Sequence, residues 1–273
     1  MSNKLYETIF GEAIGKEDRM MIFSGPTGSG KTAIQCSILR LLNGTGRNIL
    51  TAEWPVEYSL HGVNQVDCKF DIGYSDAVAM RAFLEQNPDV IMVKLEDGER
   101  SRLAFRIAEK GSLVLGAMHV PTTATVFERL RNMGIPAFDL STYVSIVQAQ
   151  RLVRRLCPDC KVQFVPSAAL LENLKVDEQL LERLELPAVP LDTVRFYKHG
   201  GCEKCSGSGY TGRALICESL KMTSKLQDMI LHGSKAAEIE KAAVEDGMIT
   251  LRQAGLRQVI LGNTAIEEAM LAT

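Results

Sequence analysis

Short apolar runs alternate with segments of helical periodicity through the first half of the chain. The runs at 20–23, 48–52, 89–93 and 112–118 are rich in Val, Ile, Leu and Met, and polar residues, glycine or proline bound them. Such runs are typical of parallel strands that are buried on both faces. The alternation predicts a three-layer α/β domain that binds its ligand at the carboxyl ends of the strands.

The segments between these runs are predicted to be helices. Ser75 is a favourable N-cap for a helix that reaches about residue 86, with Val78, Phe83 and Leu84 facing the core. The chain after residue 220 is predicted to consist of short helices, whose amphipathic faces form core or, alternatively, contact neighbouring subunits. Three capping boxes predict where these helices start: Ser224 with Gln227, Thr250 with Gln253, and Thr264 with Glu267.

Composition narrows the class of protein. The 273 residues include 31 Lys and Arg and 33 Asp and Glu, which gives a formal net charge of −2. This charge is too balanced to favour binding of nucleic acid by the protein surface as a whole. The apolar runs are far shorter than the roughly 18–20 residues that cross a bilayer, and the N-terminus has no apolar signal core. We therefore expect a cytoplasmic protein without membrane insertion. An odd number of cysteines, 7, argues against a disulfide framework.

The segment GPTGSGKT lies between the first apolar run and a helical pattern at 33–42. Its glycines allow consecutive N–H groups to converge on phosphate oxygens, while a lysine neutralises the β and γ phosphates and a threonine hydroxyl binds Mg²⁺. The alternative, a glycine-rich turn before a helix, requires neither the lysine nor the threonine. The pattern thus predicts a nucleotide-binding loop formed by Gly25, Pro26, Thr27, Gly28, Ser29, Gly30, Lys31 and Thr32.

Four cysteines form two CxxC pairs, Cys157 with Cys160 and Cys202 with Cys205, separated by the 41 residues 161–201. Two such pairs supply the four thiolates of a tetrahedral zinc site, which would be structural because no position is left for a substrate. Redox chemistry at one pair and unliganded structural cysteines are the alternatives. The intervening stretch at 167–186 is predicted to form one or two helices. The other three cysteines, at 36, 68 and 217, are expected to be small core residues.

With the phosphate loop in place, the chain resembles the secretion motor ATPases of type II secretion and type IV pilus assembly. The resemblance extends over nearly the whole chain from about residue 20. It implies a P-loop, RecA-like fold that binds ATP and Mg²⁺, and a homo-hexamer or mixed ring acting with an inner-membrane platform protein at the cytoplasmic face of the membrane. The stretches that carry it are GPTGSGKT at 25–32, TAEWPVEY at 51–58, GVNQV at 62–66, FLEQNPDVIMV at 83–93, LVLGAMH at 113–119, QAQRLVRRLCPDC at 148–160, GCEKCSGSGYTGRALICESL at 201–220 and GMITLRQAGLRQVILGNTAIEEAM at 247–270.

Two positions depart from the family pattern. The family's strand after Pro-Asp ends in Gly-Glu, whose Glu polarises the attacking water, whereas here Lys94 follows the strand and the next acidic residue is Glu96. Trp54 stands where the family has an acidic residue; we expect it to pack against the following Pro55 and Val56, with contact to the nucleotide base as the alternative. A lysine ammonium cannot accept a hydrogen bond from water. The resemblance implies catalytic roles for Glu53, Glu57 and His119, and Glu96 is a further catalytic candidate if a shifted loop brings it within reach.

The sequence thus predicts a short N-terminal segment at 1–19, a P-loop ATPase domain at 20–150, a zinc subdomain with a helical insertion at 151–220 and a C-terminal helical segment at 221–273. Only 24 residues precede Gly25, and we expect a motor region without the domain that the family places upstream.

The expected function is that of an ATP-binding motor subunit that couples hydrolysis to assembly or transport. One alternative is a nucleotide-binding structural or regulatory subunit that hydrolyses weakly or not at all. A second is a DNA-handling zinc protein, for which Arg151, Arg154 and Arg155 beside the cysteines are the argument, although an interface or phosphate-facing role for them is preferred.

Overall fold

The computed structural model describes residues 20–44, 46–186 and 190–273, so the predicted segment 1–19 lies outside it. The chain divides into two compact units. The first unit comprises the described residues up to Ala149 together with Ser219–Met248, and the second comprises Gln150–Glu218 together with Ile249–Thr273. In the described part of the chain, no helix is both long enough and apolar enough to cross a membrane.

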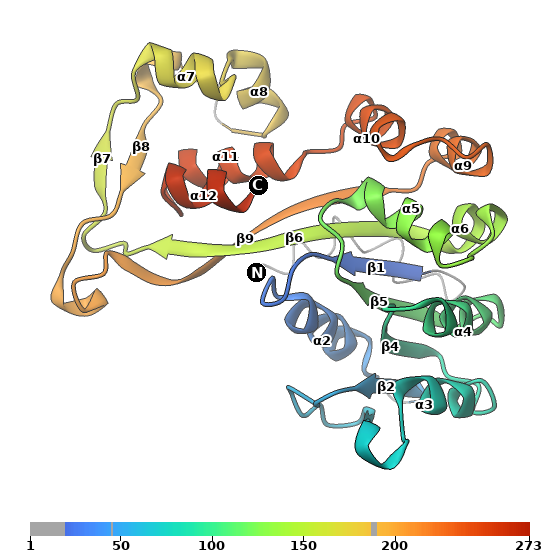
Figure 1. The fold of residues 1–273 in the computed structure, drawn as a ribbon. Helices are drawn as coiled ribbons and strands as arrows, with labels where there is room; N and C mark the ends of the chain where they lie inside the picture. The colour runs from blue at the N-terminus through green and yellow to red at the C-terminus, as the bar shows by residue number, and fades with distance from the viewer. Residues whose placement is uncertain (1–19, 45, 187–189) are drawn as a thin grey trace. The chain divides into compact units, whose positions relative to one another are not determined.

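A seven-stranded sheet has the order β3-β2-β4-β5-β1-β6-β9 (Figure 1). Strand β1 pairs in parallel with β5 and with β6. Strand β2 pairs in parallel with β3 and with β4, and β4 also pairs in parallel with β5. The carboxyl ends of these strands therefore lie along one edge of the sheet. The strands are β1 Met20–Ser24, β2 Ile49–Glu53, β3 Asn64–Asp67, β4 Val90–Lys94, β5 Leu113–Met118, β6 Val144–Leu156 and β9 Tyr210–Lys221.

Both faces of the central strands are apolar and covered. In β1, Met20 and Ile22 join one core cluster while Met21 and Phe23 join the other, because successive side chains of a strand point to opposite faces. One face is covered by α2 (Lys31–Leu42) (Figure 1). The other is covered by α3 (Asp76–Phe83), α4 (Gly98–Glu109), α5 (Thr123–Asn132), α6 (Ala137–Tyr143), α9 (Ser224–Leu231) and α10 (Ala236–Glu245). The predicted three-layer α/β domain is confirmed.

Helix α3 begins where the sequence predicts but buries a different face. The hydroxyl of Ser75 accepts the N–H of Val78 at 3.4 Å, as expected of an N-cap. The inward orientation predicted for Val78 is wrong, since this side chain is 36% exposed. The buried face contains Ala77 and Met80, which are three residues apart, and Val78 is turned about 100° away from it.

The second unit contains a short antiparallel pair and four α-helices in the described residues. β7 (Val162–Phe164) pairs with β8 (Phe196–Lys198). The insertion forms two helices, α7 (Ala168–Leu174) and α8 (Glu178–Arg183), within the predicted range. The remaining elements are the 3-10 turns η2 (Leu191–Thr193) and η3 (Glu203–Cys205) and the helices α11 (Leu251–Ile260) and α12 (Ile266–Ala272); a further turn, η1 (Phe70–Ile72), belongs to the first unit.

The C-terminal helices follow only part of the prediction. Thr250 caps α11 in the predicted box with Gln253. The cap of α9 is Thr223 rather than Ser224. The cap predicted at Thr264 is wrong, because its hydroxyl donates to the carbonyl of Arg154 at 2.8 Å and α12 starts two residues later. The predicted single segment at 221–273 is divided, since α9 and α10 belong to the first unit and α11 and α12 to the second.

Candidate functional site

The phosphate loop connects β1 to α2 at the carboxyl edge of the sheet. Gly25, Gly28 and Gly30 have φ values of 142°, 78° and 88°, which glycine adopts far more readily than other residues. The N–H of Ser29 donates to the carbonyl of Pro26 at 3.2 Å and closes a turn within the loop. The backbone therefore has the compact, glycine-dependent form that the motif predicts.

Lys31 is the first residue of α2 and only 9% exposed. Its Nζ donates to the carbonyl oxygens of Gly25 and Pro26 at 2.8 and 2.9 Å. The loop thus curls around the ammonium group and holds it at the positive end of a helix. An anion that enters the loop meets both the ammonium and the helix N-terminus.

Glu57 is brought to the phosphate loop from a separate segment. Its Oε1 accepts the hydroxyl of Thr32 at 3.3 Å. A hydroxyl and a carboxylate side by side are hard oxygen donors, the type that Mg²⁺ prefers. These two residues can therefore share a magnesium site.

Glu53 is the last residue of β2 and is 5% exposed. Its Oε1 accepts the hydroxyl of Thr51 at 2.6 Å and the amide of Gln65 at 3.0 Å. Its Oε2 is buried without a hydrogen-bond partner among the described residues. One oxygen of this carboxylate is thus held in place and the other has acceptor capacity for water or another donor.

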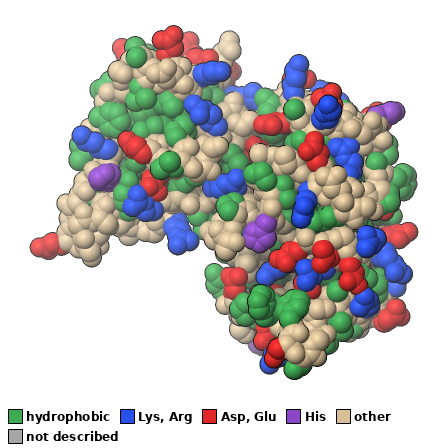
Figure 2. All heavy atoms as spheres, viewed as in Figure 1, with side chains coloured by type: hydrophobic (Ala, Val, Ile, Leu, Met, Phe, Trp, Pro, Cys, Tyr) green, Lys and Arg blue, Asp and Glu red, His purple; other side chains and the backbone are tan. Residues whose placement is uncertain are grey.

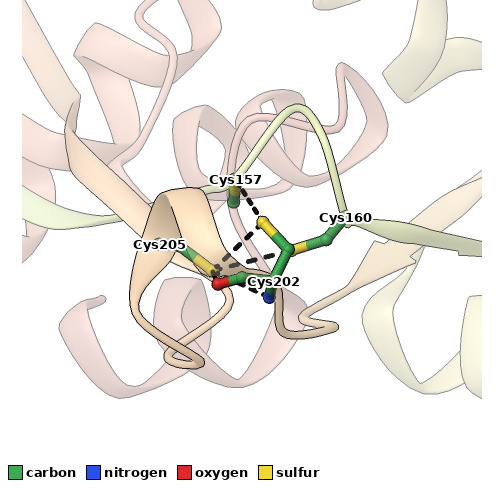
Figure 3. A group of neighbouring side chains, drawn as sticks. All are labelled: Cys157, Cys160, Cys202 and Cys205. Carbon is green, nitrogen blue, oxygen red and sulfur yellow. Dashed lines mark hydrogen bonds between the residues drawn. The ribbon is translucent and has the colours of Figure 1, made fainter.

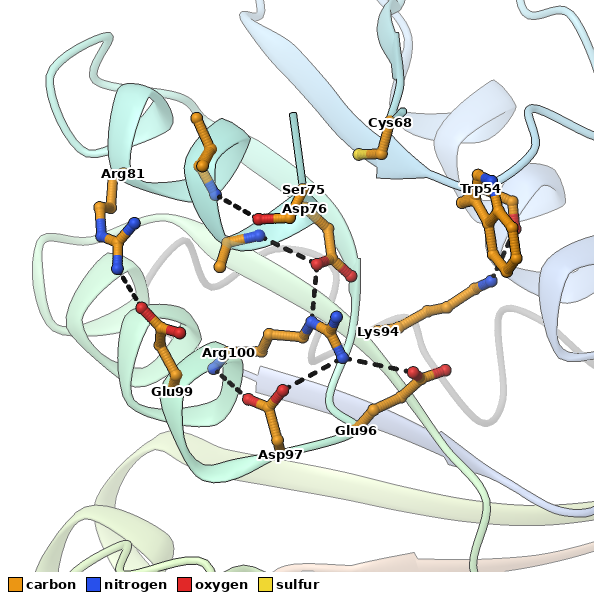
Figure 4. Close-up of polar contacts among 12 residues, drawn as sticks. Trp54, Cys68, Ser75, Asp76, Arg81, Lys94, Glu96, Asp97, Glu99 and Arg100 are labelled. Atoms are coloured by element: carbon orange, nitrogen blue, oxygen red, sulfur yellow. Dashed lines mark hydrogen bonds and ion pairs between the residues drawn. The ribbon is translucent and has the colours of Figure 1, made fainter. Parts of the chain in front are cut away.

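The end of β4 carries no carboxylate (Figure 4). Lys94 is its last residue, and its Nζ donates to the carbonyl of Trp54 at 3.1 Å. Leu95 follows with 1% exposure and belongs to the apolar core. Its side chain fills the space beside Gly116, where an added Cβ would lie 2.6 Å from Leu95 Cδ1.

Glu96 is engaged by an arginine of α4. The guanidinium of Arg100 lies 3.3 Å from Glu96 Oε2, 3.2 Å from Asp97 Oδ2 and 2.6 Å from Asp76 Oδ1 (Figure 4). It also lies over the ring of Phe70, 5.9 Å from its centroid. Glu96 is therefore part of an ion-pair network rather than directed at the phosphate loop alone.

His119 follows β5 directly and is exposed. Partial burial lowers its pKa, and the positive charges of Lys31 and Lys94 lower it further, while Glu96 opposes them. The charges of Lys31, Lys94 and Glu96 thus all reach His119. The neutral imidazole is the favoured form in the absence of an anion.

Trp54 packs edge-on against Phe70, with 5.3 Å between ring centroids, and is 60% exposed. The ring contact is thus with Phe70, whereas the sequence predicts packing against Pro55 and Val56.

The second unit brings the four paired cysteines together (Figure 3). Their sulfur atoms all lie within 4.8 Å of one another. The distances are 3.9 Å between Cys157 and Cys202, 3.8 Å between Cys160 and Cys205, and 3.7 Å between Cys202 and Cys205. A disulfide is excluded for these pairs, because its sulfur atoms would lie about 2.0 Å apart.

Backbone groups support this cluster. The N–H groups of Cys202 and Gly209 donate to Cys205 Sγ at 3.3 and 3.2 Å and lower the pKa of this thiol to about 6. Gly200 lies against the other pair, where an added Cβ would be 2.1 Å from the carbonyl oxygen of Cys160. The two CxxC loops therefore pack backbone to backbone. Of the other cysteines, Cys36 and Cys68 are buried as predicted, and burial raises the pKa of each thiol to about 11.

Arg154, for which the sequence offers a role at an interface or in nucleic-acid binding, instead contacts side chains within the second unit. It pairs with Glu268 at 2.5 Å and lies 4.1 Å from the centroid of the Tyr210 ring. On the face shown in Figure 2, basic and acidic side chains are interspersed. Neither observation favours a nucleic-acid interface.

Sequence reasoning did not identify Arg100, Asp76 or Gln65 as parts of the site. The spacing of Arg100 from Glu96 and Asp97, four and three residues on a helix start, is a signal that could have revealed two of its ion pairs. Asp76 lies 24 residues away in the chain, and no local pattern connects it to Arg100.

A family model described as "Type II/IV secretion system protein" matches residues 2–271. The chain is 40% identical over 262 residues to the type IV pilus assembly ATPase PilB of Myxococcus xanthus, covering 96% of the chain and 45% of that protein. It is 37% identical over 255 residues to the type II secretion system protein E of Dickeya dadantii, covering 93% and 48%. The chain thus spans about half the length of these relatives.

Solved structures agree at the level of the fold. The pilus retraction motor PilT, solved with bound ADP, superposes with a TM-score of 0.69 at 22% identity, covering 100% of this chain and 65% of that one. The ATPase DotB of Legionella pneumophila gives 0.67 at 17% identity, covering 99% and 63%. The phosphate loop, the parallel sheet and a family match over nearly all 273 residues lead to one assignment. The chain belongs to the type II/IV secretion system protein family.

Proposed function

We propose that this chain is an ATP-binding motor subunit of a type II secretion or type IV pilus machine, coupling ATP hydrolysis to assembly or transport. The observation that carries the proposal is the phosphate loop, where the buried ammonium of Lys31 is held by the carbonyls of Gly25 and Pro26. By family resemblance the subunit would work in a homo-hexamer or mixed ring, bound to an inner-membrane platform protein at the cytoplasmic face of the membrane.

Binding would proceed by exchange of hydrogen bonds at the loop. The ammonium of Lys31 would leave its carbonyl acceptors for oxygens of the β and γ phosphates, and backbone N–H groups at the start of α2 would bind the same anion. The hydroxyl of Thr32 and the carboxylate of Glu57 would hold Mg²⁺, whose charge offsets that of the phosphates. These residues position the phosphates and stabilise their charge, which is most of what phosphoryl transfer requires.

Hydrolysis would also need a group that orients water. Glu53 has a buried oxygen with acceptor capacity, while Glu57 lies at Thr32 and Glu96 is shared with Arg100. His119 would donate or accept a hydrogen bond near the γ phosphate. We assign the water-orienting role first to Glu53, because an oxygen without a partner can accept from water at no loss of an existing bond.

A second candidate function is that of a subunit that binds ATP and does not turn it over. It is favoured by the end of β4, where Lys94 and Leu95 follow the apolar residues and the Gly-Glu of the family pattern is absent. Loss of such a group slows phosphoryl transfer and can leave binding intact.

Steady-state phosphate release from the purified protein separates these functions. The motor proposal expects turnover that Lys31→Ala abolishes and that Glu53→Gln lowers by about 100-fold or more. Glu57→Gln and Glu96→Gln, compared at saturating MgATP, show whether the other carboxylates contribute. ATP binding without turnover, both alone and in the presence of the platform protein, would refute the motor proposal in favour of the second candidate.

For the cysteine cluster we assign structural zinc. A tetrahedral zinc site with Zn–S bonds of about 2.3 Å has sulfur atoms about 3.8 Å apart. The three distances of 3.7–3.9 Å fit this value, and the four thiols match the ligand set of structural sites. The metal would be held by Cys157, Cys160, Cys202 and Cys205 and would join the two loops.

Elemental analysis of protein purified without chelator tests this assignment. It expects about one zinc per chain, lost in Cys160→Ala and retained in Cys217→Ala, a cysteine of the same unit outside the cluster. Protein that is folded and free of zinc would refute it.

A further inference from the structure

The segment 54–60 between β2 and β3 forms neither helix nor strand, yet it carries Glu57 to the phosphate loop. A segment without a backbone ladder keeps a fixed course only where side chains hold its backbone groups. On one side of Glu57, the amide of Gln65 donates to the carbonyl of Tyr58 at 2.9 Å, and its oxygen accepts the N–H of Leu60 at 2.7 Å. On the other side, the described contact to a backbone group is the ammonium of Lys94 on the carbonyl of Trp54.

Lys94 comes from a rigid part of the fold. It is paired in the sheet, with its Cα opposite Ala117 of β5, and the four residues before it in β4 are buried. Its ammonium points toward the Trp54 backbone in Figure 4. A charged donor on a carbonyl forms a stronger bond than a neutral one. The contact thus ties this irregular segment, three residues before Glu57, to β4, which lies between β2 and β5 in the sheet.

We propose that Lys94 is a positioning residue that holds the segment 54–57 over the carboxyl edge, so that the carboxylate of Glu57 remains at Thr32. The inference rests on the proposed nucleotide site, in which Glu57 and Thr32 bind Mg²⁺ together. It assigns to Lys94 an action through the backbone of Trp54, and no contact with nucleotide. Lys94 and Glu57 then serve one step, the binding of the metal–nucleotide complex.

Two quantities should respond to Lys94→Gln. The affinity for MgATP should fall about 3- to 10-fold, the size expected for one hydrogen bond, while the affinity for ATP in EDTA should change by less than about twofold. The chain has 1 tryptophan, so intrinsic fluorescence reports on Trp54. Acrylamide should quench this fluorescence more efficiently in Lys94→Gln than in the wild type, because the backbone of Trp54 loses its anchor.

The variants isolate the role of the lysine. Lys94→Arg keeps a charged donor and should retain more of the MgATP affinity than Lys94→Gln does. Lys110→Gln is the matched control, since its Nζ also donates to a backbone carbonyl, that of Leu84 at 2.8 Å, but precedes β5 at the opposite edge of the sheet. It should change neither MgATP affinity nor quenching.

A double-mutant cycle with Glu57→Gln decides the proposal. If Lys94 acts through Glu57, the double variant should bind MgATP about as weakly as the weaker single variant. Two results would show that Lys94 acts by another route and would overturn the proposal. One is that the losses of MgATP affinity in the two single variants multiply in the double variant; the other is that Lys94→Gln lowers the affinity for ATP equally with and without Mg²⁺. If instead Lys31→Ala bound MgATP as the wild type does, the nucleotide site itself would be wrong, and that result is distinct from either outcome of the cycle.

Discussion

The charge state of His119 depends on the charged groups around it. Burial and the ammonium groups of Lys31 and Lys94 lower its pKa, so the free protein favours neutral imidazole. At pH values between that lowered pKa and the unfolded value of about 6.5, the unfolded chain binds more protons at His119 than the folded chain does. The contribution of His119 to the free energy of unfolding is therefore lost as the pH falls through this range. Phosphates at the loop would reverse the local field and raise the pKa.

We therefore predict proton uptake on ATP binding near pH 6.5. Calorimetric titration in two buffers of different ionisation enthalpy should give different apparent binding enthalpies at that pH and the same enthalpy at pH 8.5. His119→Gln should remove the difference. Buffer-independent enthalpies at pH 6.5 in the wild type would show that the phosphates do not reach the imidazole.

Arg100 has a structural role that a substitution should reveal. It is 15% exposed and pairs with Asp76, which is 8% exposed. Arg100→Gln would leave that carboxylate without its guanidinium, and we predict a loss of about 2–4 kcal/mol in the free energy of unfolding. Arg81→Gln is the control, because its pair with Glu99 is more than half exposed on both sides and should be worth less than about 1 kcal/mol. Equal urea midpoints for the two variants would contradict the prediction.

The sequence identifies those parts of the site that consecutive residues encode. The strand, loop and helix around Lys31, and the spacing of each cysteine pair, can be recognised without a structure. The contacts of Lys94 with the Trp54 carbonyl and of Gln65 with the Tyr58 carbonyl cannot, since a backbone acceptor has no signature in the sequence. The roles of the carboxylates depend on such contacts, so their ranking needs the structure.

Among the secondary-structure elements, apolar strands were predicted and mixed ones were missed. β1, β2, β4 and β5 match the four apolar runs to within a residue or two. β6, with 13 residues, carries arginines in its second half, and β9, with 12 residues, is polar and largely not buried over its first half. Where a strand extends beyond the buried part of a sheet, its sequence is no longer a continuous run of apolar residues. The alternation of apolar and polar residues alone is then too weak a pattern to identify the strand.

At the cysteine cluster, we expect the close packing of the two CxxC loops to depend on the absence of a side chain at Gly200. In Gly200→Ala, the new Cβ would meet the Cys160 carbonyl oxygen at 2.1 Å, and one CxxC loop must move away from the other. We predict weaker zinc retention, measured as metal loss to a competing chelator, at least about tenfold faster than in the wild type. Lys204→Ala, which removes the exposed pair with Asp159 and leaves the close approach of Gly200 to Cys160 intact, should retain zinc much better than Gly200→Ala. Unchanged retention in Gly200→Ala would show that the loops do not need this close approach.

For the whole molecule, the division into two units separates the two proposed ligands. All the residues of the phosphate loop belong to the first unit, and all four clustered cysteines belong to the second. The chain passes between the units after Ala149, Glu218 and Met248, so neither unit is one continuous stretch. Ligand binding stabilises the part of a protein that binds it, by about 2.7 kcal/mol at a concentration 100 times Kd.

Scanning calorimetry should consequently resolve two responses. MgATP should raise the melting temperature of one transition and a zinc chelator should lower that of the other, because each ligand is linked to the unfolding of its own unit. Lys31→Ala should remove the first response and keep the second, and Cys160→Ala should do the reverse. A single transition that MgATP and chelator both shift would mean that the units unfold as one cooperative body, in which case loss of zinc would also weaken ATP binding at temperatures near the transition.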